Sequence, residues 1–158
     1  MKDNRRMAAG SVITFVTLVL SVVSFAVYRM NIKGEGYFQN AAVPMAANLT
    51  VAAIILAAVV LIAGQFQLQG IADILLKLVT GAARIIVPVL CIAAMMYVIN
   101  GRIEGFAFIY MSNEEVLHEV QTAANMSSAH GAIANIVLLG VSALFGMIGA
   151  FFNMSKQK

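Results

Sequence analysis

The chain has 158 residues, of which 61% are hydrophobic and 11% are charged, and its formal net charge is +3. Soluble domains average roughly 45–50% apolar and about 25% charged residues, so this composition excludes an ordinary soluble domain. The basic residues form no patch, which argues against a nucleic-acid partner, and the single cysteine, Cys91, excludes an internal disulfide and CxxC redox chemistry.

Four apolar stretches account for this composition. They predict membrane-spanning helices at about residues 7–28, 41–64, 71–99 and 129–152. About 20 residues at 1.5 Å each are needed to cross a ~30 Å hydrocarbon core, and each stretch is long enough. We therefore expect an all-α membrane protein whose single domain, residues 1–158, is a four-transmembrane-helix bundle with loops 29–43 and 100–128 on one side.

The basic residues indicate how the bundle is oriented. With the N-terminus in the cytoplasm, three of them fall outside: Arg29, Lys33 and Arg102. The other seven fall inside: Lys2, Arg5, Arg6, Lys77, Arg84, Lys156 and Lys158. Because positive residues favour cytoplasmic loops, we expect a multi-pass plasma-membrane protein with both termini cytoplasmic and a small extracytoplasmic cap.

Two of the predicted helices carry stripes of small residues. In helix 41–64 the stripe is Ala46, Ala53, Ala57 and Gly64, with Pro44 suited to the first turn. In helix 129–152 it is Ser142, Gly146 and Ala150, with Gly149 nearby. Such faces let helix backbones approach closely, within one bundle or between partners, and we favour packing within the bundle for helix 129–152. Alanine is common throughout helix 41–64, so its spacing there leaves the role of Ala53 and Ala57 open.

Two polar side chains lie within predicted spans. Arg84 is about six residues, roughly 9 Å, inside the apolar run that begins at Leu78. An intramembrane charge is a candidate for binding or ion pairing, but a long side chain near a helix end also snorkels to the headgroups, and the short apolar stretch 85–99 favours snorkelling. Asn135 is deep enough to require a hydrogen-bond partner on another helix.

The cap, residues 100–128, divides into two parts. Phe106, Phe108 and Tyr110 alternate in a way typical of a strand at 105–111, although a segment lying on the headgroups is an alternative. Ser112 followed by Glu115 forms a capping box that predicts an amphipathic helix at about 113–124. Its apolar face contains Val116, Leu117 and Val120. We expect these aromatic and aliphatic side chains to form a partner-binding surface, which Tyr37 and Phe38 of the first loop could join.

No residue pattern predicts catalysis or a cofactor. Glu115, His118 and Glu119 share part of a helix face, but they supply too few metal ligands, and His130 is a helix-length away. A solvated polar face is the better interpretation. Serine and histidine residues occur in the cap without any spacing that pairs a nucleophile with a base.

The region 100–152 resembles a known group of proteins. Its most distinctive part reads GRIEGFAFIYMSNEEVLHEVQTAANMSSAHGAI. It is similar to small uncharacterised four-helix membrane proteins of Gram-positive bacteria, whose members can be encoded beside membrane-anchored glycoside hydrolases. The resemblance implies a bacterial membrane protein but assigns no functional residue. Claudin-like proteins need tryptophan and a cysteine pair, and small multidrug exporters need a glutamate in their first helix; this chain has neither pattern.

Three functions compete at this level. The first is a non-catalytic accessory or scaffolding subunit that associates with a larger membrane or surface-anchored protein, a glycoside hydrolase being one candidate, or with itself. The second is a small oligomeric transporter or channel subunit, for which only Arg84 offers an intramembrane charge. The third is a membrane enzyme, for which no set of reactive residues is apparent. We favour the first.

Overall fold

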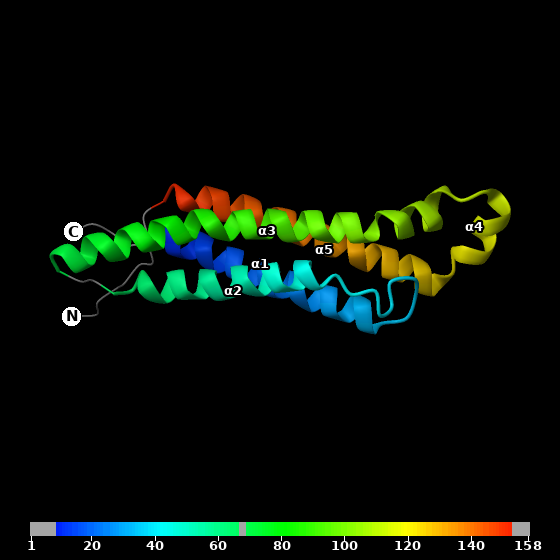
Figure 1. The fold of residues 1–158 in the computed structure, drawn as a ribbon, viewed down its shortest axis with the longest axis horizontal. Helices are drawn as coiled ribbons and strands as arrows, with labels where there is room; N and C mark the ends of the chain where they lie inside the picture. The colour runs from blue at the N-terminus through cyan, green and yellow to red at the C-terminus, as the bar shows by residue number, and fades with distance from the viewer. Residues whose placement is uncertain (1–8, 67–68, 153–158) are drawn as a thin grey trace.

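The computed structural model describes residues 9–66 and 69–152, and within these ranges every regular element is a helix (Figure 1). The helices are α1 (Ala9–Lys33), α2 (Pro44–Ala63), α3 (Ile71–Met111), α4 (Glu114–Val120) and α5 (Ala123–Ala150). All except α4 are long and apolar enough to cross a membrane. The structure thereby confirms the predicted all-α fold with four helices long and apolar enough to span a membrane.

The four long helices run up and down and enclose a narrow core. α1 packs most extensively against α5, α5 against α3, α3 against α2, and α2 more sparsely against α1. Small residues allow this close packing, as in the buried cluster of Ala53, Cys91 and Ala143. α4 lies at one end of the bundle, the α4 end, and α1 begins and α5 ends at the opposite, terminal end (Figure 1).

The strand expected at 105–111 is wrong, because these residues continue α3. Arg102, Gly105 and Ile109 repeat at steps of three and four and are buried against the bundle. That helical spacing overrides the alternation of Phe106, Phe108 and Tyr110, since a helix satisfies its own backbone hydrogen bonds and a lone strand cannot. α3 is 41 residues long, roughly 60 Å, about twice the thickness of the hydrocarbon core.

The amphipathic helix expected at about 113–124 is shorter than predicted. α4 ends at Val120, and Ala123 already begins α5, whose predicted start was residue 129. The side chain of Asn113 caps α4 by accepting a hydrogen bond from the Val116 N–H (3.2 Å), whereas the predicted cap, Ser112, donates to the Phe108 carbonyl. Thr122 caps α5 in the same way through the Asn125 N–H.

Several basic residues behind the predicted orientation lie outside the described ranges. They are Lys2, Arg5, Arg6, Lys156 and Lys158.

Pro44 occupies the first turn of α2, as predicted. Proline is favoured there because the N–H that it lacks would have no partner within the helix.

Candidate functional site

A row of buried polar side chains on α1 runs along the bundle, and we call it the polar seam. It consists of Ser11, Thr14, Thr17, Ser21, Ser24 and Tyr28. The apolar side chains of the same helix, such as Phe15 and Val22, face outward instead. The helix is therefore polar inside and apolar outside, as expected when lipid replaces water around a bundle. The three- and four-residue spacing of these hydroxyls was a signal that the sequence analysis missed.

The hydroxyls of the seam are satisfied partly within α1. Thr14, Thr17 and Ser21 each donate to the carbonyl four residues earlier, at 2.7, 3.0 and 2.9 Å. Such bonds allow a hydroxyl to be buried without a partner on another helix. The seam can therefore face a dry interior at low cost.

Ser142 joins the seam to α5 and α3. Its hydroxyl is 2.6 Å from that of Ser21 and 3.1 Å from the Thr17 carbonyl oxygen. Cys91 Sγ lies 3.7 Å from the Ser21 hydroxyl and 3.8 Å from that of Ser142. Ser142, predicted only as a small packing residue, thus also supplies a hydrogen bond between helices.

Asn135 forms a second link between α1 and α5, at Ser24. Its Nδ2 donates to the Ser24 carbonyl (2.9 Å) and to the Ser24 hydroxyl (2.8 Å), and that hydroxyl lies 3.3 Å from the Asn135 carbonyl. This is the interhelical partner that the depth of Asn135 led us to expect. The Oδ1 atom of Asn135 has no hydrogen-bond partner among the described residues.

The predicted small-residue faces lie inside the bundle. Ala53 and Ala57 of α2 are fully buried, as are Gly146 and Gly149 of α5, while Ala150 is half-buried. A Cβ on Gly146 would lie 3.2 Å from Pro88 Cβ, and one on Gly149 would lie 3.1 Å from Ile13 Cγ2. Both glycines therefore allow α5 to approach its neighbours closely.

Arg84 caps the end of α5 from across the bundle. Its guanidinium donates to the carbonyls of Gly149 and Phe152. The Gly149 carbonyl also accepts a hydrogen bond from the Phe152 N–H (3.2 Å), and a cation at this position suits the negative end of the helix dipole. The side chain therefore contacts the end of α5, and its snorkelling to the headgroups stays a prediction.

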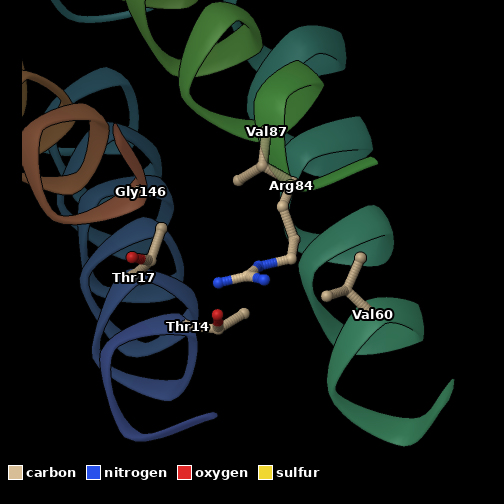
Figure 2. A pocket seen from close by; sticks show the side chains of 6 residues that line it. All are labelled: Thr14, Thr17, Val60, Arg84, Val87 and Gly146. Atoms are coloured by element: carbon tan, nitrogen blue, oxygen red, sulfur yellow. The ribbon is translucent and has the colours of Figure 1, made fainter. Parts of the chain in front are cut away.

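A small cavity adjoins Arg84. Figure 2 shows the guanidinium between Thr14 and Thr17 on one side and Val60 on the other. The cavity measures about 10 Å³, close to the minimum for one water molecule. The Nε of Arg84 has no hydrogen-bond partner among the described residues. The arrangement leaves space for a water but not for a larger ligand.

Arg102 is the functional candidate that the sequence analysis missed. It was counted as a loop residue, yet it lies on the inward face of α3 with 2% of its surface exposed. Its guanidinium carbon is 4.4 Å from the centroid of the Phe38 ring, a cation–π contact. Within the described residues, 9–66 and 69–152, the ion pair that forms is between Lys77 and Asp73. No described carboxylate therefore neutralises Arg102.

The signal in the sequence that could have identified Arg102 is its spacing from Arg84. Arg84 and Arg102 are 18 positions apart on one continuous helix. That distance is about five helical turns and roughly 27 Å, so both side chains share a face and are separated by nearly the hydrocarbon thickness.

Aromatic rings gather at the α4 end, where the partner surface was predicted. The aromatic cluster consists of Tyr37, Phe38, Phe106, Phe108 and Tyr110. Ring centroids are 5.6 Å apart for Tyr37 and Phe108 and 5.5 Å apart for Phe38 and Phe106. The first loop therefore does reach the predicted surface.

The members of this surface differ in exposure. Phe38 is buried and Phe106 is half-buried against it, whereas Tyr37, Phe108 and Tyr110 remain 42%, 42% and 37% exposed. On α4, Val116, Leu117 and Val120 are half-buried. The exposed rings thus lie on a buried aromatic base that holds them in place.

The described residues contain no group of three or more His, Cys, Asp or Glu side chains that could hold a metal ion. Comparison with protein-family models, with curated proteins and with solved structures finds no match for this chain.

Proposed function

We propose that this protein is a non-catalytic accessory or scaffolding subunit of the plasma membrane. It associates through its α4 end with a larger membrane or surface-anchored protein. The aromatic cluster carries this proposal, because three of its rings are exposed while Phe38 and Phe106 support them from below. Pre-positioned aromatic side chains are typical anchors of protein interfaces. The resemblance noted above makes a membrane-anchored glycoside hydrolase the first partner class to examine.

The interior of the bundle supports an accessory role better than transport. Residues 9–28, 44–63, 85–101 and 131–150 contain no Asp, Glu, His, Lys or Arg. Proton- or ion-coupled transport usually relies on ionisable groups within the membrane, and arginine does not release its proton. The polar seam is hydrogen-bonded and tightly packed, and the cavity beside Arg84 holds about 10 Å³. A small oligomeric transporter or channel subunit remains the alternative outcome of the tests below.

Removal of the exposed rings should weaken partner binding. We expect a Phe108→Ala, Tyr110→Ala double variant to recover much less partner than the wild type when both are purified in mild detergent. Truncation of an anchor ring commonly costs about 2 kcal/mol, roughly thirtyfold in Kd. The measurement is mass-spectrometric quantification of co-purified chains at matched expression and thermal stability.

A lipid-facing pair provides the control. Phe15 and Phe145 are 52% and 37% exposed and lie on α1 and α5. A Phe15→Ala, Phe145→Ala variant removes the same number of rings and should retain the partner. Equal recovery with both double variants, or no partner with the wild type, would count against an accessory role and favour the transporter alternative.

We propose further that both termini are cytoplasmic and that the α4 end is extracytoplasmic. Two introduced cysteines test this orientation: Glu115→Cys on α4 and Lys77→Cys near the start of α3, both at exposed positions. The native Cys91 is fully buried and should contribute little background. In intact cells an impermeant maleimide should label Glu115→Cys, and Lys77→Cys should react only after permeabilisation. The opposite labelling pattern would reverse the orientation.

A further inference from the structure

The outer face of α3 carries a row of apolar side chains, which we call the α3 stripe. It follows alternating steps of four and three residues and consists of Ile71, Leu75, Leu78, Ala82, Ile85 and Val89. All of them are exposed, and the larger ones are between 56% and 78% exposed. Buried residues of the same helix, such as Ala83 and Val87, face the bundle instead. The stripe therefore lies on the side of α3 that no described helix covers.

The spacing of the stripe is typical of helix pairing. Alternating steps of four and three give a period of 3.5 residues, which is the pattern of the a and d positions in a coiled coil. Lipid tails require an apolar surface but no such period. The neighbouring Ile74, Val79 and Ile86 are also exposed and uncharged. Two α3 helices can therefore meet along the stripe without charge repulsion.

Lipid tails explain the start of the stripe least well. α2 contains 20 residues and no charge, about the length that crosses the hydrocarbon core. At the terminal end, the first turns of α3 project past the ends of α1, α2 and α5 (Figure 1). These turns also contain Asp73 and Lys77, which lie off the stripe and pair with each other (2.7 Å). Because charged side chains favour water or headgroups over hydrocarbon, the apolar side chains beside them need a cover other than lipid tails.

The size and symmetry of the stripe fit a second copy of this chain. A fully exposed aliphatic side chain offers about 60–120 Å² of apolar surface. At the observed exposures, the stripe with Ile74 and Val79 supplies roughly 500 Å² per copy, and two copies reach the ~1,000 Å² that a specific interface needs. Copies that follow the same insertion signals share one orientation in the membrane. The two stripes then run parallel, and each residue meets its own counterpart.

We propose that this protein forms a parallel homodimer in which the α3 stripes of two copies pack against each other. Both α4 ends then lie on the same side of the membrane, and the dimer presents two aromatic clusters. Two linked sites raise the apparent affinity for a partner that can engage both at once. The dimer does not depend on a partner at the α4 end, so its failure leaves the proposed accessory role untouched.

Cysteine cross-linking in isolated membranes tests this pairing. Leu75→Cys and Leu78→Cys each place a thiol on the stripe, and Lys77→Cys places one at an exposed position off it. A disulfide needs Cα atoms within about 7 Å, a distance that facing residues of a parallel pair meet and that position 77 does not. After oxidation with copper–phenanthroline, we expect about tenfold more covalent dimer from the two stripe variants than from Lys77→Cys. The wild type gives the background, since Cys91 is fully buried.

A charge on the stripe provides a second test. Leu78→Glu places two carboxylates opposite each other and should raise the dimer Kd by at least about tenfold, measured by single-molecule photobleaching in lipid vesicles. Phe66→Glu adds the same charge at the same end of the bundle but outside α3, and it should leave the Kd unchanged. The thermal midpoint of each variant checks that the monomer fold is retained, as expected for substitutions at exposed positions.

The outcomes separate the possible occupants of the stripe. Equal cross-linking at positions 75, 77 and 78, or an unchanged Kd for Leu78→Glu, would overturn the dimer. Cross-linking of the stripe cysteines to a different chain would replace the second copy with another protein. A monomeric wild type without any covalent dimer would overturn the proposal and assign the stripe to lipid.

Discussion

Replacement of Gly146 with leucine should lower the free energy of unfolding of the bundle in detergent by about 1–3 kcal/mol, the usual cost of overpacking a filled core. Even a Cβ at this position would lie 3.2 Å from Pro88 Cβ and 3.4 Å from Pro88 Cδ. The proline ring belongs to the interior of α3 and has little freedom to move. The leucine side chain must therefore push α5 away from α3.

The midpoint of thermal unfolding, followed by circular dichroism, measures this effect. Ala134→Leu is a matched control, because Ala134 is an exposed residue of the same helix. It introduces the same side chain on the lipid-facing side and should leave the midpoint nearly unchanged. If Gly146→Leu also leaves both the midpoint and the association state unchanged, the close contact between α5 and Pro88 does not stabilise the bundle.

Truncation of Arg102 should destabilise the α4 end of the bundle by about 2–4 kcal/mol, since it removes a desolvated cation–π contact and leaves a cavity. Phe38 would lose the guanidinium that covers its ring at 4.4 Å. Arg102→Met fills most of the vacated volume without a charge and should retain more stability than Arg102→Ala. Arg102→Lys places a more strongly hydrated ammonium in the same dry position and should be less stable than Arg102→Met.

Thermal unfolding of the three variants tests this order, with Arg29→Ala as the control. Arg29 is an exposed arginine on α1, and its truncation should have little effect. Wild-type stability of Arg102→Ala would show that the buried guanidinium does not hold Phe38 in place. It would also remove the support that we infer for the exposed rings of the aromatic cluster.

The cap illustrates why part of the structure could not be predicted. The alternation of Phe106, Phe108 and Tyr110 and the helical spacing of Arg102, Gly105 and Ile109 occupy the same residues. The sequence pattern alone does not show whether the chain follows the strand-like alternation or the helical spacing. The buried contacts of Ile109 with Phe38 and α5 decide in favour of the helix, because only that conformation places these side chains against the bundle.

The polar seam and Arg102 were missed for different reasons. The spacing of Thr14, Thr17, Ser21 and Ser24 is visible in the sequence, but apolar residues surround these hydroxyls and mask the pattern. Arg102 was placed in a loop because the predicted helix ended at residue 99. Once α3 is known to continue, the 18-residue separation from Arg84 places both arginines on one face.

The sequence by itself determined that the chain has four helices long and apolar enough to span a membrane, because the thickness of the hydrocarbon core sets the length that such an apolar helix needs. It also identified Asn135 as a residue that needs an interhelical partner, since an amide at that depth cannot bond to water. Only the tertiary structure decided which partners those groups have. Ser24, Ser142 and Arg84 bond to residues more than 60 positions away, and such pairings depend on the relative rotation and depth of helices that are all equally apolar outside.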